Sequence, residues 1–177
     1  MKTILKIVLS FGILILLALI CALFLNKNYV VTKSIIINKP HSEIFNYVKY
    51  LRNQNEYSKW AKMDTGMGKV FSGTDATPGF ISAWDSKQDD VGKGEQEIVN
   101  ITYGQQIDYK IRFEKPTKDI AKSFMRTDSI APAKTLVKWQ ISGHMNYPLN
   151  MMGLFMDKMI GGDLETGLAN LKRIKER

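Results

Sequence analysis

The feature that most constrains this chain is a long uncharged apolar run near its N-terminus. Between Ile7 and Leu25 there is no charged side chain, and one serine and one glycine are the only breaks in the run. At 1.5 Å per residue, a helix of this length extends about 28 Å, which matches the hydrocarbon core of a bilayer. The run predicts a transmembrane anchor over residues 1–28, followed by a single domain over residues 29–177.

Two other interpretations of the run remain open. A cleaved secretory signal also begins with positive charge, but its apolar stretch is usually about 7 to 15 residues and ends at a small-x-small site. The residues at 24–28 form no such site. A lipidated Cys21 would need small residues directly before it, where the chain has leucine and isoleucine. A retained membrane anchor fits the residues best.

The charges that flank the run give only a slight preference for one orientation. Lys2, Lys6 and the terminal amine lie before it, and Lys27, Lys33 and Lys39 lie after it. A short N-terminal tail without acidic residues is easily left in the cytoplasm. We therefore expect a single-pass protein of the cytoplasmic (inner) membrane, with its N-terminus inside and its domain on the outer side.

Composition and motifs exclude several classes of function. The 25 basic and 17 acidic side chains give a net charge of +8, and no basic run interleaved with aromatic residues is present. The sequence has no HExxH, CxxC or glycine-rich phosphate loop, and its two histidines stand far apart. We therefore expect no nucleic-acid partner, no metal and no cofactor.

Residues 107–114 carry the clearest strand pattern, because apolar and charged residues alternate there over eight positions. Such alternation is typical of a strand with one buried and one wet face. Other strand candidates at hairpin-like spacing predict an antiparallel sheet of six or seven strands, with a hairpin turn at residues 92–94. These candidates are residues 29–37, 79–85, 94–103, 118–128 and 137–141.

Two helices are predicted, one after the first strand and one after the last strand. A short one begins near Ser42, after the first strand. A long one closes the chain, because apolar residues recur every three or four positions from Leu149 to Leu171. Gly161 and Gly162 interrupt its middle, which predicts a kink or the close approach of another backbone.

Five segments carry a resemblance to a known family: VTKSIIINKP (31–40), LRNQNEYSKWAKMD (51–64), GKGE (92–95), FEKP (113–116) and MGLFMDKMIGGDLETGLANL (152–171). They resemble bacterial polyketide cyclase/dehydrase-like proteins of the SRPBCC (START/Bet v 1-like) superfamily. The resemblance implies an α+β helix-grip fold, in which a curved antiparallel sheet wraps around a long C-terminal helix with an apolar cavity between them.

Aromatic and methionine side chains are the candidates for the wall of this cavity. Methionine is flexible and polarizable, so it adapts to apolar guests of different shape, although it also fills gaps in an ordinary core. The ligand-binding candidates are Trp84, Tyr109, Ile111, Phe113, Trp139, Met152, Met156 and Met159.

No catalytic residue is predicted, and we expect a non-catalytic domain that binds a lipid-like or other apolar small molecule. The alternative is a cyclase or dehydratase acting on a hydrophobic substrate, for which acids or bases would come from His144, Asp157, Glu165, Arg112 or Glu114. It would require a buried ionisable group with a shifted pKa. A third hypothesis is an interaction domain whose cavity has collapsed.

Overall fold

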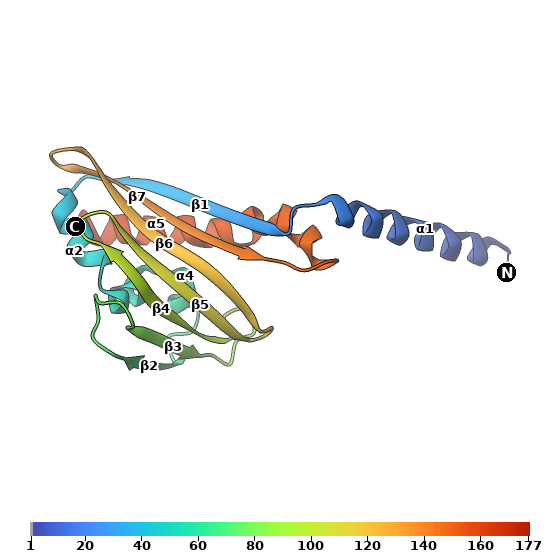
Figure 1. Cartoon of the computed structure of the whole chain (residues 1–177), viewed down its shortest axis with the longest axis horizontal. Coiled ribbons are helices and arrows are strands. Elements are labelled where there is room, and N and C mark those ends of the chain that lie inside the picture. The colour runs from blue at the N-terminus through green and yellow to red at the C-terminus, as the bar shows by residue number, and fades with distance from the viewer. Residues whose placement is uncertain (1) are drawn as a thin grey trace.

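The computed structural model describes residues 2–177 and shows a long helix, α1 (Lys2–Phe24), that projects from an α+β domain (Figure 1). The domain is a seven-stranded antiparallel sheet curved around the C-terminal helix α5 (Gly162–Lys175), which confirms the predicted helix-grip fold. The strands are β1 (Asn28–Ile37), β2 (Gly68–Ser72), β3 (Ile81–Asp85), β4 (Lys93–Thr102), β5 (Gln106–Lys115), β6 (Asp119–Ala131) and β7 (Lys134–His144).

The sheet order is β1-β7-β6-β5-β4-β3-β2, so strands β2 to β7 follow one another as hairpins and β1 pairs with β7. A register shift between Ile98 and Asn100, in the β4–β5 pair, adds to the bending of the sheet. The alternation predicted for residues 107–114 is confirmed: Ile107, Tyr109 and Ile111 are buried, and the charged residues between them face outward.

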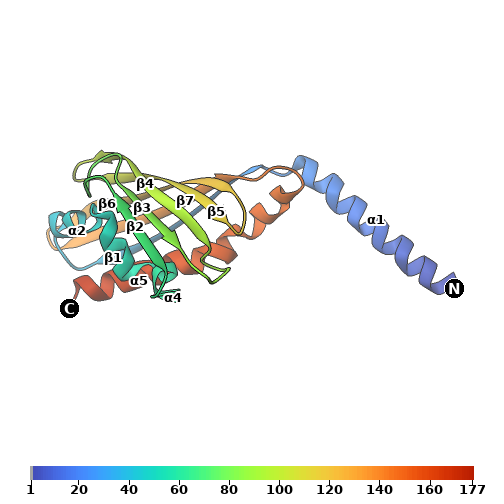
Figure 2. The ribbon, with the colours of Figure 1, turned by 90° about the horizontal axis from the view of Figure 1, so that it is seen from below.

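The helix predicted after the first strand is α2 (His41–Val48), which buries three apolar side chains and contacts β6 and β7. Three short turns follow it: η1 (Leu51–Asn53), α3 (Gln54–Tyr57) and α4 (Lys59–Met63). The last two contact α5, so the β1–β2 connection and α5 lie together against the concave face of the sheet (Figure 2).

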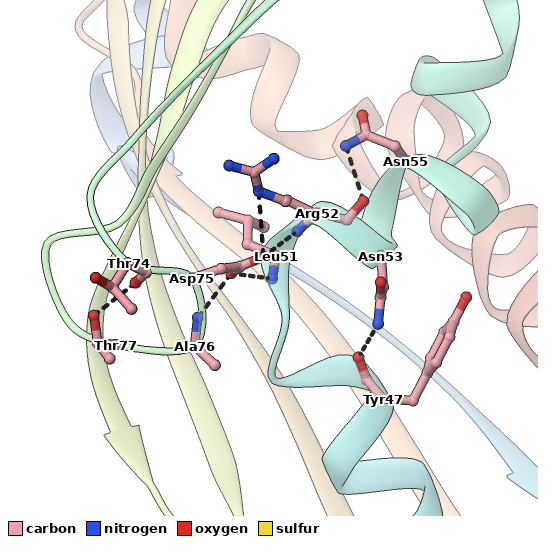
Figure 3. A network of polar contacts seen from close by, with 9 residues as sticks. All are labelled: Tyr47, Leu51, Arg52, Asn53, Asn55, Thr74, Asp75, Ala76 and Thr77. Carbon is pink, nitrogen blue, oxygen red and sulfur yellow. Dashed lines mark hydrogen bonds and ion pairs between the residues drawn. The ribbon is translucent and has the colours of Figure 1, made fainter.

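Asp75, in the β2–β3 connection, holds the start of the short turns in place (Figure 3). Its carboxylate accepts hydrogen bonds from the backbone N–H groups of Leu51 at 2.8 Å, Arg52 at 3.1 Å and Ala76 at 2.8 Å. The guanidinium of Arg52 in turn lies 4.2 Å from the centre of the Phe71 ring. One side chain therefore joins the helical connection to the loop between β2 and β3.

We expect Asp75→Ala to lower the free energy of unfolding by about 2 kcal/mol, because it leaves partly buried N–H groups without a charged acceptor. Asp75→Asn, which keeps an acceptor oxygen, should cost about half as much. Chemical denaturation of the full chain in a mild detergent measures both. Equal losses for the two variants would contradict the role given to the hydrogen bonds.

The prediction of one continuous closing helix from Leu149 to Leu171 is wrong in its first half. That half consists of a 3₁₀ segment, η2 (Leu149–Phe155), and a π segment, η3 (Asp157–Gly161). A Cβ on Gly161 would lie 2.6 Å from Cε of Lys33, so the glycine leaves room for a side chain from β1. Regular α-helix begins only beyond this contact.

The predicted hairpin turn at residues 92–94 is also corrected. The β3–β4 connection ends at Gly92, which has a φ of +63°, and β4 begins at Lys93. Gly94 lies within the strand, where an added Cβ would stand 2.8 Å from the Trp84 ring. The second glycine therefore serves packing, since only a residue without a side chain fits beneath the indole.

Candidate ligand cavity

A cavity of about 350 Å³ lies between the sheet and the helical segments, near the N-terminal end of α5. All seven strands contribute to the sheet side, β1 and β2 with one residue each. The opposite side is formed by η1, α3 and α4, and Met145, Met156 and Ile160 complete the lining. This volume falls in the lower part of the roughly 300–1,000 Å³ range of small-molecule sites.

Aromatic rings give the cavity a stiff apolar wall. Trp84 and Phe113 meet edge to face at 6.1 Å, and Trp60 meets Trp139 at 6.3 Å in the same geometry. Trp139 packs so closely on α5 that a Cβ on Gly167 would lie 2.7 Å from its ring. Rings fixed by such contacts lose little freedom when a ligand binds beside them.

Several uncharged polar residues face this apolar space: Gln54, Asn55, Ser58, Ser82, Gln96, Thr117 and Ser123. The side-chain amides of Gln54 and Gln96 bond to each other reciprocally, at 3.2 Å in both directions, across the gap between α3 and β4. Ser123 Oγ accepts a hydrogen bond from Trp139 Nε1 at 3.3 Å. A ligand with one carbonyl or hydroxyl group can be oriented here without placing a charge in the cavity.

Tyr29 is the most buried ionisable residue of the described lining. Burial, with a smaller contribution from Asp119, raises the pKa of the Tyr29 phenol, which lines the cavity. Burial likewise raises the pKa of Tyr57 and Tyr109, which lie in the surrounding core. These phenols stay neutral at physiological pH, so they can donate a hydrogen bond but supply no anionic base.

The charged lining residues stand toward the end of the sheet from which α1 departs. They are Lys69, Asp90 and Asp119, at the start of β2, in the β3–β4 connection and at the start of β6. Close by, Lys93 pairs with Glu114 at 2.9 Å. The interior is therefore apolar, and the charge gathers at its mouth.

The structure brings five of the eight predicted ligand-binding residues together and leaves three outside the cavity. Trp84, Ile111, Phe113, Trp139 and Met156 line it. Tyr109 is buried in the core behind the lining. Met152 and Met159 are 42% and 51% exposed and lie outside the lining, on the η2 and η3 segments.

The residues considered as acids or bases lie outside the cavity lining. His144 is exposed, with Nδ1 2.9 Å from Asn28 Oδ1. Asp157 and Glu165 are largely exposed and pair with Lys33 at 3.2 and 3.0 Å. Hydrogen bonds to these two carboxylates raise the pKa of the lysine.

Arg112 and Glu114 lie on the outer face of the sheet. Arg112 pairs there with Glu95 at 2.7 Å and with Glu97, contacts that raise its pKa. The other histidine, His41, bonds to Thr127 with Nε2 2.9 Å from Oγ1. Within residues 2–177, no three His, Cys, Asp or Glu side chains gather as metal ligands would.

Sequence reasoning missed the polar part of the lining, which includes Gln54, Gln96 and Ser123. A signal for Gln96 was available, because it occupies an inward position between Gly94 and Ile98 in an alternating strand. A glutamine among buried neighbours indicates a polar partner or a ligand. Its actual partner comes from a segment 42 residues away, which alternation in one strand does not identify.

The seven-stranded sheet, the closing helix and the cavity between them define a helix-grip domain preceded by one apolar helix. In fold the chain is similar to norcoclaurine synthase from Thalictrum flavum (TM-score 0.65, 8% identity, covering 83% of this chain and 93% of that one). It is also similar to the di-domain ARO/CYC protein BexL (TM-score 0.61, 13% identity, 85% and 51% covered). A third similar structure is Ara h 8.0201 (TM-score 0.55, 11% identity, 83% and 97% covered).

At such low identities these likenesses show the fold alone, which agrees with the superfamily resemblance of the five sequence segments. No protein-family model matches the chain, and no curated protein matches it. Helix α1 is long and apolar enough over Thr3–Phe24 to span a membrane, with a mean hydropathy of 3.1, and a signal sequence has the same properties.

Proposed function

We propose that the protein is a membrane-anchored binding module, in which residues 1–28 span the cytoplasmic membrane and residues 29–177 hold a lipid-like or other apolar small molecule. The observation that carries the proposal is the cavity itself. Its interior is walled by aromatic and aliphatic side chains, its polar groups are neutral, and its charged groups stand at the mouth.

The shape of the cavity also limits the class of ligand. A volume of about 350 Å³ suits a compact or single-chain amphiphile. The Gln54–Gln96 pair and Ser123 suit a ligand with one hydrogen-bonding group at the end of an apolar body. Two of the structures similar in fold are described as a synthase bound to a transition-state analogue and an ARO/CYC protein of a biosynthetic pathway, which supports a small organic ligand.

One observation favours the alternative, a cyclase or dehydratase. Tyr29 is 8% exposed, lines the cavity and has a raised pKa, so its neutral phenol is placed to donate a proton or a hydrogen bond to a substrate oxygen. Asp119, the lining carboxylate close enough to raise that pKa, is only half-buried and lies at the charged end of the cavity. Binding without catalysis therefore needs fewer assumptions.

Native mass spectrometry of the full chain, released from detergent micelles, tests the binding proposal. We expect one apolar molecule per chain that survives the removal of loosely bound detergent and lipid. Lipid extraction then identifies its class. A chain that carries no such molecule and, after delipidation, takes up neither ANS nor a fluorescent fatty acid would contradict the proposal.

A further inference from the structure

The mouth of the cavity and the helix α1 lie at the same end of the sheet. The register places Asn28 opposite His144, Phe113 opposite Asp119, and Asp85 opposite Lys93. The starts of β1, β4 and β6 and the ends of β3, β5 and β7 therefore lie along one edge of the sheet. The connections that leave this edge supply the lining residues Val91, Pro116, Thr117 and Met145. In both Figure 1 and Figure 2, α1 leaves the domain from this edge.

The segment after β7, residues 145–160, is attached directly to the last turn of α1. The side chain of Asn150 is 1% exposed, and its Nδ2 donates to the carbonyl oxygens of Ala22 at 2.7 Å and Leu25 at 3.2 Å. The Met145 N–H also donates to the carbonyl of Lys27, at 2.7 Å. Asn150 thus satisfies carbonyl groups that the end of a helix leaves free.

These bonds fix the depth of the segment relative to any membrane that α1 crosses. The apolar run ends at Leu25, and Asn26, Lys27 and Asn28 follow it, as expected where a helix leaves the hydrocarbon for the headgroup layer. Because Asn150 bonds to both Ala22 and Leu25, η2 lies at that same level.

The outward side of this segment is strongly apolar. Leu149, Leu154 and Phe155 are 62%, 66% and 58% exposed. Met152 and Met159 are also exposed, and between positions 145 and 160 the sequence carries only one acidic and one basic residue. Exposed apolar side chains gathered in one segment mark an interaction surface, and a surface beside a membrane helix matches the apolar face of an interfacial helix.

The inward side of the same segment contributes Met145, Met156 and Ile160 to the cavity lining. Its backbone is built from 3₁₀ and π turns, which are less regular than α-helix and are common at functional hinges. The η2 and η3 segments therefore lie between the cavity and the exposed apolar surface.

We propose that residues 149–159 lie in the headgroup layer beside α1 and form the wall through which an apolar ligand passes between the bilayer and the cavity. This inference rests on the proposed function, because it takes α1 as a membrane-spanning helix. It goes further in two ways. The exposed apolar side of residues 149–159 contacts the lipid bilayer, and the ligand enters the cavity from that side.

Spin-label depth measurements test the placement. The full chain, with Cys21→Ser, carries a nitroxide on Leu154→Cys, on Leu14→Cys in α1, or on Ser129→Cys at the far end of β6. Each form is reconstituted in vesicles of phosphatidylethanolamine and phosphatidylglycerol. We expect the label at 14 to be accessible to oxygen but not to aqueous nickel, the label at 129 to show the reverse, and the label at 154 to be several-fold richer in oxygen contact than the label at 129.

The outcomes separate this inference from the membrane anchor. If the label at 154 has the same accessibility to oxygen and nickel as the label at 129, while the label at 14 lies in lipid, the inference is overturned. The membrane anchor would still be supported. A label at 14 in water overturns the anchor and this inference with it. Dipolar broadening between labels at 154 on two copies, in detergent and vesicles alike, would assign the surface to self-association and overturn the bilayer as its occupant.

Transfer kinetics test the loading route. The double variant Leu154→Asp, Phe155→Asp is expected to take a fluorescent fatty acid from donor vesicles about tenfold more slowly, while it binds the same probe added from solution within twofold of the unchanged chain. A transfer rate equal to that of the unchanged chain would show that the ligand enters elsewhere.

Discussion

Replacing Trp139 with alanine is expected to lower the free energy of unfolding by about 3–5 kcal/mol, the range typical of large-to-small changes in a core. The indole is 1% exposed and meets Tyr57 and Trp60 edge to face at 5.9 and 6.3 Å. It also fills the space above Gly167 on α5. Its removal takes away the contact that joins β7, the short turns and the closing helix. Denaturant titration of the full chain in detergent, followed by near-UV circular dichroism, measures the loss.

Trp139→Phe is the matched control for this change. It keeps most of the apolar contact and removes the hydrogen bond from Nε1 to Ser123 Oγ, so a loss of about 1–2 kcal/mol is expected. If the alanine and phenylalanine variants were destabilised equally, the hydrogen bond rather than the packing would dominate at this position. If neither lost stability, Trp139 would not be the centre of the core.

Ile111→Trp is expected to weaken binding of the co-purified molecule, or of ANS, by at least about tenfold. A tenfold loss of affinity corresponds to roughly 1.4 kcal/mol of binding free energy. Ile111 lies on β5, is 7% exposed and lines the cavity, so the larger ring occupies the space that the ligand would fill. The cavity can absorb part of the added volume, which should keep the cost in stability near the lower end of about 1–3 kcal/mol. Fluorescence titration and native mass spectrometry measure the effect.

Lys110→Trp provides the control on the same strand. Lys110 stands at an outward position between two buried residues, so its substitution adds the same ring to the opposite face of the sheet. Its binding should stay within twofold of the unchanged chain. Equal loss for both variants would mean that the probe binds the outer surface or α1, and equal retention would mean that the ligand lies elsewhere.

Local periodicity predicted the parts of the fold that depend on one strand or helix at a time. The alternation at residues 107–114 was enough to place Ile111 and Phe113 on the concave face, because the side-chain direction in a strand follows from position alone. The buried stripe Leu164, Leu168 and Leu171 on α5 was predictable in the same way. The short edge strand β2 was not, since its five residues carry weak alternation between two turns.

Contacts between distant segments account for what the sequence did not predict. The closing helix is broken where Lys33 of β1 approaches Gly161, which no pattern within residues 149–171 reveals. In the 3₁₀ and π segments before this contact, Met152 and Met159 are exposed and Met156 lines the cavity. The periodic spacing of apolar residues is the same whether a helix faces a core or a membrane, so exposure could be assigned only from the structure.

The short connection between α1 and β1 limits how far the domain can move. Three residues, Leu25, Asn26 and Lys27, join the two elements, and three extended residues reach only about 10 Å. Asn150 ties the same junction a second time. With α1 in a bilayer, such a domain cannot carry its ligand across an aqueous gap to another membrane. Delivery of the ligand over a distance would require a soluble acceptor that comes to the domain. The domain itself would stay beside the leaflet at which α1 ends.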